Sequence, residues 1–310
     1  MNTSPNSPSP IEFSGRVAIV TGAGGGLGRQ HALALAARGA KVLVNDLGGM
    51  LDGSGGSPIA AQSVVDEIRA AGGEALANGA SVTDFAAVQA MVQQAVNAWG
   101  RVDILVNNAG ILRDKSFAKM ELADFRLVLD VHLMGAVHCC KAVWPLMNAQ
   151  KYGRIVMTTS SSGLYGNFGQ SNYSAAKMAL VGLMQTLAIE GAKNDIRVNC
   201  LAPTAATRMT EGLMPTEVLQ ALTPQSVVPA MLVLVGQDAP SRAILGAGAG
   251  TFEASYITMT QGMHIGSDAQ APERLAEHLA QVMQRDGDSV PQDGSAQGTN
   301  EIAKAQAARA

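Results

Sequence analysis

Short aliphatic strands alternate with longer helical segments from Arg16 to about Gly266, and this alternation leaves few folds open to the chain. The strands are expected near residues 16–21, 41–45, 74–78, 103–107, 153–159 and 196–202. Strands so rich in Val, Ile and Leu are typical of parallel sheets that carry helices on both faces. We therefore predict an α/β protein with a single Rossmann-type, doubly wound parallel sheet, whose ligand crevice lies at the carboxyl ends of the strands.

Four segments are expected along the chain. Residues 1–14 are rich in Ser, Pro and Asn and predict a disordered N-terminal tail. Length alone favours about two domains, but the unbroken alternation favours one Rossmann-type domain over 15–270. Apolar positions at helical spacing predict an appended helix over 271–285, which could cap the substrate side, meet a neighbouring subunit or dock on its own core. Residues 286–310 are polar and predict a flexible C-terminal tail.

The composition excludes several classes of protein. With 47% hydrophobic residues, 15% charged residues and a net charge of −3, the chain can bury a sizeable core and has no basic excess for nucleic acid. Apolar runs are shorter than a membrane span, the N-terminus lacks a secretory pattern and the last residues are not a Ser-Lys-Leu peroxisomal address, so a cytoplasmic protein is expected. Three cysteines and scattered histidines predict no disulfide framework and no metal site.

A glycine-rich turn follows the first expected strand. Gly22, Gly26 and Gly28 permit a tight turn and a close approach of the backbone to a pyrophosphate. The helix that begins near Leu27 would direct its N-terminal amides at that anion. The spacing Gly-x-x-x-Gly-x-Gly differs from the commonest dinucleotide fingerprint and is a variant of it. The turn therefore predicts a dinucleotide site.

Asp46 ends the second expected strand. A carboxylate at this position can accept hydrogen bonds from the adenosine ribose hydroxyls and would repel a 2′-phosphate. The sequence therefore predicts NAD rather than NADP as the cofactor, the alternative being that Asp46 only caps a turn.

Tyr173 and Lys177 stand four positions apart, so that on a helix the phenol and the ammonium share one face. A free tyrosine has a pKa near 10, and a base near neutrality needs a pKa lower by roughly 2 to 3 units. The Lys177 ammonium, together with an oxidised nicotinamide, would favour the phenolate. Ser160 follows the strand at 153–159 and can hydrogen-bond a substrate oxygen. The alternative for the Tyr/Lys pair is two residues on a surface helix.

The order of these motifs resembles the short-chain dehydrogenase/reductase family over nearly all of residues 15–266. The resemblance is closest to the (3R)-hydroxyacyl-CoA dehydrogenase units of type 2 peroxisomal multifunctional enzymes. It is carried by five stretches: residues 45–49 with the glycine-rich insert that follows, 107–114, 166–170, 187–191 and 204–210.

The resemblance implies site residues by their matching positions. Ser160, Tyr173 and Lys177 are the implied catalytic residues, and the family spacing selects Ser160 over Thr159, Ser161 and Ser162. Tyr173 and Lys177 would also contact the cofactor. Further cofactor contacts are implied at Ser81, Val82, Asn108, Ala109, Gly110, Pro203 and Thr204. The residues after Thr204 would form a mobile substrate lid.

Two positions depart from the common family pattern. His132 stands where many members have a catalytic asparagine, and it is interpreted either as a trait of the subgroup or as a core residue. Ala80 stands where many members have an aspartate near the adenine, which could lower the affinity for NAD.

Together these features predict an NAD-dependent short-chain alcohol dehydrogenase that interconverts a secondary alcohol and a ketone without a metal. The resemblance implies a 3-hydroxyacyl-CoA of (3R) type as substrate; a hydroxysteroid or another secondary alcohol is the alternative, and an NAD(H)-sensing regulatory protein is the non-enzymatic one. Arg113, Lys115, Lys119 and Arg208 could reach CoA phosphates or be solvated surface charges. Helices expected at 121–149 and 173–192 carry more apolar surface than one contact face requires. The resemblance implies that these two helices form a dimer interface, so a homodimer or homotetramer is expected.

Overall fold

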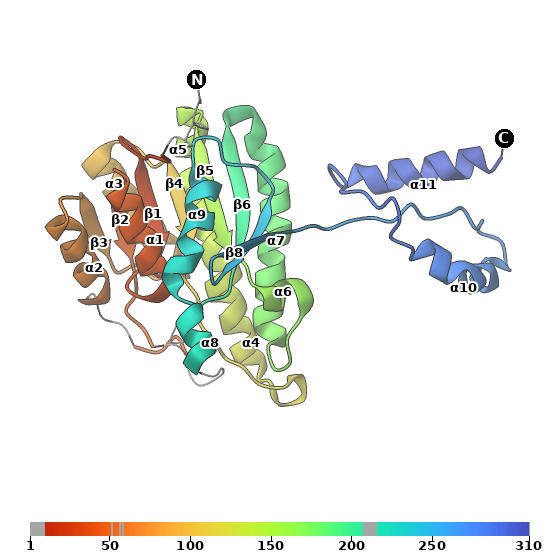
Figure 1. Cartoon of the computed structure of the whole chain (residues 1–310), viewed down its shortest axis with the longest axis horizontal. Coiled ribbons are helices and arrows are strands. Elements are labelled where there is room, and N and C mark those ends of the chain that lie inside the picture. The colour runs from red at the N-terminus through yellow and green to blue at the C-terminus, as the bar shows by residue number, and fades with distance from the viewer. Residues whose placement is uncertain (1–9, 51, 56, 58, 207–215, 310) are drawn as a thin grey trace, which may run out of the picture. The chain divides into compact units, whose positions relative to one another are not determined.

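The structure is a computed structural model, and it describes residues 10–50, 52–55, 57, 59–206 and 216–309. The chain divides into two compact units, Met1–Ala254 and Ser255–Ala310. The first unit contains the sheet, and the second contains two helices joined by loops (Figure 1). The division falls earlier than the expected boundary at residue 270, because the chain after Ala254 makes its contacts within the second unit.

The described residues form an eight-stranded sheet of order β3-β2-β1-β4-β5-β6-β7-β8, with parallel pairing from β3 to β7. The strands are β1 Val17–Thr21, β2 Lys41–Asn45, β3 Ala75–Asn78, β4 Ile104–Asn107, β5 Gly153–Thr158, β6 Ile196–Pro203, β7 Ile244–Gly248 and β8 Thr251–Ser255. The first six match the expected strands. β7 and β8 were not expected, since the short, glycine-rich sequence of β7 gives little strand signal.

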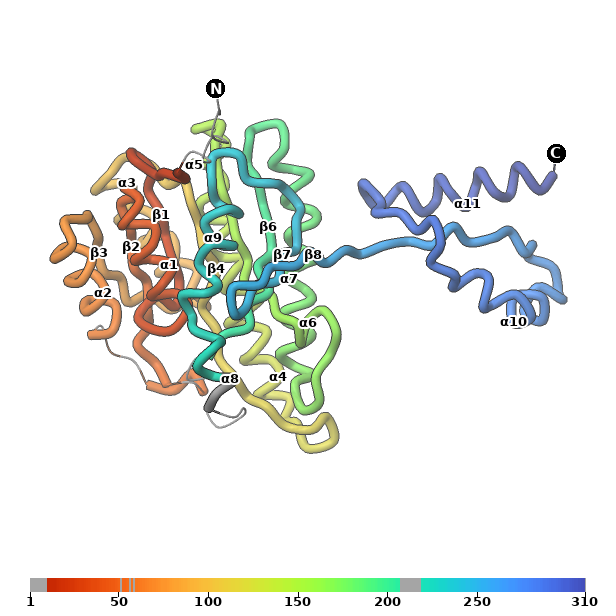
Figure 2. Tube along the Cα trace, in the orientation of Figure 1, coloured from red at the N-terminus to blue at the C-terminus, as the bar shows by residue number. Residues whose placement is uncertain are grey.

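Helices cover both faces of the sheet, as the tube in Figure 2 shows. They are α1 Gly26–Ala37, α2 Ile59–Ala70, α3 Phe85–Trp99, α4 Leu122–Leu129, α5 Gly135–Gln150, α6 Ser161–Tyr165, α7 Ser171–Gly191, α8 Thr216–Ala221 and α9 Val228–Val235. α1, α2 and α9 contribute to one hydrophobic core, and α3, α5 and α7 contribute to the other. The predicted doubly wound α/β fold is confirmed.

A π-helical turn, Asp130–Met134, joins α4 to α5. The resulting helical run Leu122–Gln150 has the length and composition of a possible membrane span. In the first unit, however, α5 packs on α3, β4 and β5, and its buried side chains belong to the core. The run is therefore a core helix of the doubly wound fold.

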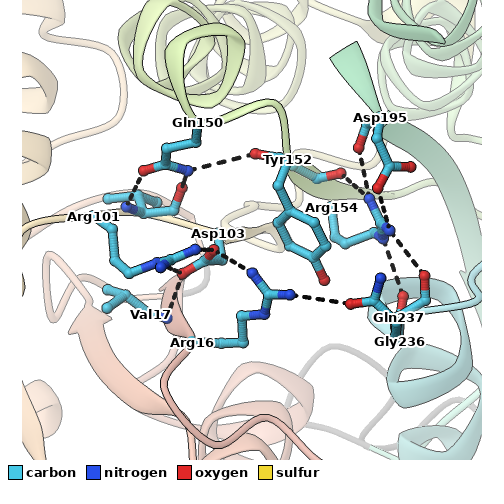
Figure 3. Close-up of polar contacts among 12 residues, drawn as sticks. Arg16, Val17, Arg101, Asp103, Gln150, Tyr152, Arg154, Asp195, Gly236 and Gln237 are labelled. Atoms are coloured by element: carbon cyan, nitrogen blue, oxygen red, sulfur yellow. Dashed lines mark hydrogen bonds and ion pairs between the residues drawn. The ribbon is translucent and has the colours of Figure 1, made fainter. Parts of the chain in front are cut away.

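A cluster of charged side chains lies at the amino ends of the central strands (Figure 3). The Asp103 carboxylate is fully buried and accepts hydrogen bonds from Arg16 (3.1 Å), Arg101 (2.7 Å) and the Val17 amide (2.9 Å). Asp103 directly precedes β4, and Val17 is the first residue of β1. Because β1 and β4 are neighbours in the sheet, this carboxylate links the starts of two adjacent strands.

Arg154 lies in the same cluster and is also fully buried. Its guanidinium donates to the carbonyls of Gly236 (3.0 Å), Gln237 (2.8 Å) and Asp195 (2.7 Å). The Tyr152 ring lies between two guanidinium groups, with 3.7 Å from its centroid to Arg16 Cζ and 4.2 Å to Arg154 Cζ. These contacts satisfy buried charges and hold the starts of the strands together.

The ends of the chain differ from expectation in two ways. Phe13, within the segment expected to be disordered, is buried in the core, and its amide donates to the Arg38 carbonyl (2.8 Å). Residues 1–9 lie outside the described residues. In the second unit, α10 Ala271–Val282 matches the appended helix, and α11 Ser295–Ala307 lies within the tail for which no helix was expected, because its composition is polar and shows no apolar period.

Candidate active site

A cavity of about 510 Å³ opens at the carboxyl ends of the central strands. It is lined by residues that follow β1, β2, β4, β5 and β6 and by the first turns of α7. Every site residue expected from the sequence lines this cavity except Gly28. The structure therefore brings the residues predicted from the sequence together around one cavity.

The glycine turn forms the floor of the cavity at the end of β1. Gly22 has a φ of +62°, and a Cβ there would come within 2.7 Å of the Ala109 Cα. Gly28 lies beneath the turn, where a Cβ would collide with the Gly22 carbonyl and the Asn108 side chain. The turn thus has no room for side chains, and its backbone is open to a ligand that presents phosphates to the amides of α1.

Asp46 lies beside this turn and is held by two backbone amides. Gly24 N donates to one carboxylate oxygen (2.7 Å) and Gly48 N donates to the other (2.6 Å). The same carboxylate lines the cavity with Asn45 and Leu47. The carboxylate is therefore fixed in place with lone pairs left to accept hydrogen bonds from ribose hydroxyls.

The resemblance implies that Asn108 contacts the cofactor, and the structure shows a structural role for its side chain beside that expectation. Its side-chain amide donates to the carbonyls of Thr21 (3.0 Å) and Gly22 (2.9 Å), while Thr21 Oγ1 accepts from the amides of Asn108 (3.0 Å) and Ala109 (3.1 Å). Asn108 consequently ties the end of β4 to the glycine turn, although it also lines the cavity.

Ser160 and Tyr173 meet at the end of β5. The Ser160 side chain caps α6 by accepting from the Ser162 amide (3.2 Å) and also hydrogen-bonds the Tyr173 side chain. Tyr173 is in the first turn of α7, and its ring lies edge-on to the His132 ring with 5.2 Å between centroids. The two hydroxyl groups thus face one point in the cavity.

The pKa of Tyr173 moves in the opposite direction from the expected one. Burial raises it above the usual value, the Ser160 hydrogen bond lowers it and the charge of Asp114 raises it further. Lys177 does not lower it, because burial reduces the pKa of Lys177 itself to about 7. The protein residues alone therefore keep Tyr173 protonated near neutrality.

Lys177 extends from the next turn of α7 into the same wall. Its ammonium donates to the Thr158 carbonyl (2.6 Å) and lies 5.4 Å from the centroid of the Tyr173 ring. The close approach of α6 to α7 at Gly163, where a Cβ would come within 2.7 Å of Lys177 Cβ, fixes the stem of this side chain. The remaining ammonium protons are available to a ligand.

His132 lies on the π-helical turn and is buried against the end of β4. Its Nε2 is 3.0 Å from the Ile111 amide and 2.8 Å from the Ile111 carbonyl, and Gly110 leaves room for its ring. Burial, and then the charge of Lys177, holds its pKa well below the usual value, so the ring is neutral. In the described residues its Nδ1 has no hydrogen-bond partner, and neither do the buried Asn107 Oδ1 and Thr158 Oγ1.

The remaining predicted residues occupy the two ends of the cavity. Ser81 and Val82 follow β3, while Pro203 ends β6 and Thr204 donates its amide to the Ala247 carbonyl (2.8 Å). Polar residues not assigned by sequence reasoning also line the wall, and Asn167 and Gln170 form a chain of hydrogen bonds to Asp114. Their place within one of the resemblance stretches was the available signal for them.

The cations considered for CoA phosphates are partly engaged. Arg113 pairs with Asp124 (3.2 Å), and Lys115 Nζ is 3.9 Å from the same carboxylate. Lys119 ends a short 3₁₀ turn, Phe117–Lys119, and does not line the cavity. Arg208 and the other residues of the expected lid between 207 and 215 lie outside the described residues. Within the described part of the chain no cluster of His, Cys, Asp or Glu has the form of a metal site.

The residues present fit a nicotinamide dinucleotide. The glycine cradle, the fixed Asp46 carboxylate and the Tyr173–Lys177 wall lie along one continuous cavity. The family model described as short chain dehydrogenase matches residues 16–217.

Relatives with known names share both sequence and fold with this chain. The peroxisomal multifunctional enzyme type 2 of Drosophila melanogaster is 45% identical over 92% of the chain, and the match covers 52% of that enzyme. The full-length structure of that enzyme matches with a TM-score of 0.78 and 36% identity, covering 95% of this chain and 50% of the other. The chain thus spans about half the length of this relative.

A second solved structure gives a comparison with a bound cofactor. A 7α-hydroxysteroid dehydrogenase in complex with NADH and 7-oxo glycochenodeoxycholic acid matches with a TM-score of 0.69 and 32% identity, over 77% of this chain and 95% of the other.

Proposed function

Because this chain belongs to the short-chain dehydrogenase family, and is therefore an oxidoreductase that uses a nicotinamide cofactor, we propose that its substrate is a 3-hydroxyacyl-CoA of (3R) configuration and its cofactor NAD. The observation that carries the proposal is the convergence of Ser160, Tyr173 and Lys177 on the cavity that the glycine turn and Asp46 also line. A sensor of NAD(H) would have no use for this trio, so the family membership and the intact wall favour turnover.

The proposed roles follow from the geometry. Ser160 and Tyr173 would hold the substrate hydroxyl, since both hydroxyl groups face the same point. Tyr173 would accept the hydroxyl proton during oxidation and return it during reduction. When bound, the oxidised nicotinamide accepts the hydride, and its positive charge favours the phenolate. That charge is needed because burial alone raises the pKa of Tyr173.

Lys177 would position the cofactor and the phenol together. It is held by the Thr158 carbonyl, and with a pKa of about 7 it can exchange a proton near neutrality. A second buried positive group lowers the cost of phenolate formation only while that lysine is protonated. We therefore expect the oxidative activity to depend both on the positive charge of the oxidised nicotinamide and on a protonated Lys177.

Asp46 supports NAD as the preferred cofactor. Two amides already neutralise part of the field of its carboxylate, but the carboxylate remains an acceptor and an anion. A 2′-phosphate placed against it would meet like charge, whereas two free ribose hydroxyls would donate to it. Ala80 stands where many family members have an aspartate near the adenine, but the Asp46 carboxylate beside the ribose site is still present.

Part of the cavity wall is apolar, which supports an acyl chain as part of the substrate. It includes Ile111, Leu112, Leu127 and Val131. The resemblance to (3R)-hydroxyacyl-CoA dehydrogenase units supports a hydroxyacyl-CoA as the substrate. The names of the relatives, peroxisomal multifunctional enzyme type 2 among them, support a peroxisomal rather than the expected cytoplasmic location.

A homodimer or homotetramer remains part of the proposal. On the first unit, α7 turns its core side toward the sheet but leaves Met178 39% and Ile189 50% exposed, and Met134 on the preceding π turn is 39% exposed. Apolar side chains exposed on long helices favour burial against a second copy.

The direct test follows NADH absorbance with purified protein and matched substrates. The panel contains (3R)- and (3S)-3-hydroxyacyl-CoAs of equal chain length, a 7α-hydroxysteroid and a simple secondary alcohol. We expect turnover to be fastest with the (3R) thioester. Faster turnover of the steroid or the (3S) thioester would contradict the proposed substrate, while inertness toward all four would contradict the proposed chemistry.

A further inference from the structure

The segment between β2 and α2 forms a closed loop, and we call its described residues, 47–50, 52–55 and 57, the strap. At its base the Ser57 amide donates to the Leu47 carbonyl (2.9 Å). At its tip the Met50 amide donates to the Ser54 carbonyl (2.7 Å). These bonds close the loop at two levels, so the strap has a defined shape of its own.

The tip of the strap contacts a segment two strands away in the sheet. Arg113 Nε donates to the Asp52 carbonyl (2.8 Å), and Gly53 lies against Ile111, where a Cβ on the glycine would be 3.3 Å from the Ile111 side chain. Ile111 and Arg113 follow β4, whereas the strap begins at the end of β2.

The position of β1 gives this contact its meaning. In the sheet β1 lies between β2 and β4, so a loop that starts at β2 and reaches the segment after β4 spans the carboxyl end of β1. The glycine turn begins at that end. Leu47, Gly49, Met50 and Gly53 line the same cavity as the glycine turn.

The base of the strap depends on the residue proposed to bind ribose. Asp46 accepts from Gly48 N with one oxygen and from Gly24 N with the other, so its carboxylate joins the strap to the glycine turn. The tip depends on Arg113, which also pairs with Asp124 of α4 (3.2 Å). One support of the strap, Asp46, therefore lines the cofactor cavity, and the other, Arg113, directly follows Ile111 and Leu112, which also line it.

We propose that the strap closes over a bound nicotinamide dinucleotide and that Arg113 is the positioning residue that keeps it closed. The inference rests on the proposed cofactor and not on the proposed substrate. Release of the cofactor then requires the Arg113 hydrogen bond to break and the tip to leave Ile111. Arg113 controls how long the cofactor stays bound, without touching the reacting atoms.

The test measures the release of NADH from the full chain by stopped-flow fluorescence, with Arg113→Met compared with Lys115→Met. The two variants remove the same charge from the same segment and beside the same Asp124 carboxylate, but of the two side chains only that of Arg113 bonds the strap in the described residues. Loss of a charged hydrogen bond should raise the NADH release rate by about tenfold in Arg113→Met. An exposed ion pair contributes little, so Lys115→Met should stay within about twofold of wild type.

Hydrogen exchange supplies a readout that does not depend on activity, and its comparison of wild type with and without NADH does not depend on the variants folding. We expect bound NADH to slow exchange at the strap amides of the wild type, and to slow it less in Arg113→Met. Equal release rates for Arg113→Met and Lys115→Met, or strap amides that exchange at the same rate with and without NADH, would overturn the proposal. NADH that fails to bind the wild type would overturn both the strap and the proposed cofactor, whereas NADH binding without acyl-CoA turnover would contradict only the substrate.

Discussion

The two ends of the same sheet treat buried polar groups in opposite ways. At the amino ends, Asp103 and Arg154 are fully buried: Asp103 accepts hydrogen bonds from three neighbouring groups, and Arg154 donates to the carbonyls of Gly236, Gln237 and Asp195, as Figure 3 shows. At the carboxyl ends, Asn107 Oδ1, His132 Nδ1 and Thr158 Oγ1 are buried without partners among the described residues. The amino end is thus built to be stable, while the carboxyl end gives up stability to keep polar groups ready for ligands.

Removing one phenolic oxygen at each end gives the largest expected contrast. Tyr173→Phe should lower kcat by about a thousandfold, since a positioned acid–base group contributes on that order. Tyr152→Phe keeps the ring between Arg16 and Arg154 and should leave kcat unchanged. Steady-state rates with NAD and a (3R)-hydroxyacyl-CoA measure both. Turnover of Tyr173→Phe within a few-fold of wild type would contradict the catalytic assignment.

Removing a charge at the amino end should lower stability and leave the activity of the folded protein intact. Arg154→Met leaves several buried carbonyls without donors, and we expect the free energy of unfolding to fall by about 3 kcal/mol. Activity per folded molecule should persist. Denaturant unfolding measures the loss. The matched control is Arg197→Met, which pairs with the same Asp195 but has a one-third exposed side chain, and it should cost about 1 kcal/mol or less. Equal losses for the two variants would remove the distinction between the ends.

At the carboxyl end, Asp46 can be altered without touching the reacting groups. Asp46→Ser removes the anion beside the glycine turn, and we expect the preference for NAD over NADP in kcat/KM to fall by at least about tenfold, because like-charge contacts cost several kcal/mol. Asp66→Asn on α2 is the control, because this exposed carboxylate lies outside the cavity and accepts a hydrogen bond from Gln62 (2.7 Å). Equal efficiency of the wild type with both cofactors would contradict the assignment of Asp46.

His31 sharpens the comparison because it is a buried polar side chain that lies outside the site. It is on α1, and in the described residues neither ring nitrogen has a partner. Burial lowers its pKa from 6.5 to about 4. The unfolded chain therefore binds a proton between pH 6.5 and 4 that the folded chain does not, so stability falls as the pH falls through this window.

His31→Leu removes this proton linkage. At pH 5.5 the variant should recover about 1 kcal/mol of the loss that the wild type shows relative to pH 7.5. Thermal or denaturant unfolding at the two pH values measures the difference. If the stabilities of wild type and variant changed in parallel between pH 7.5 and pH 5, the lowered pKa of His31 would be contradicted.

Much of this molecule follows from local sequence. The first six strands could be predicted because most of them are short runs rich in Val, Ile or Leu. The site could be predicted because its residues end those strands or begin the helices after them. β7 could not be predicted, because three of the residues in Ile244–Gly248 are glycine or alanine, and the segment forms a strand through its pairing with β6. The burial of Phe13 depends likewise on a surface made by distant residues.

The electrostatics of the site could not be predicted from spacing. The sequence places Lys177 one turn from Tyr173, but it does not show that both side chains are buried. Burial raises the pKa of Tyr173 and lowers the pKa of Lys177, so that it favours the neutral form of each. The contact of Arg113 with the strap also joins residues far apart in sequence, through a backbone carbonyl that carries no pattern. Side-chain chemistry was predictable where helix period or strand ends fixed it, and not where tertiary packing did.

The central claim is that Tyr173 takes the hydroxyl proton of a (3R)-3-hydroxyacyl-CoA while the hydride at the same carbon passes to NAD. The most direct measurement uses a (3R)-hydroxyacyl-CoA with deuterium at C3 and determines the mass of the NADH formed. The account predicts that wild-type enzyme yields deuterated NADH and that Tyr173→Phe yields almost none in the same time. Unlabelled NADH from the wild type, or labelled NADH formed equally fast by Tyr173→Phe, would contradict it.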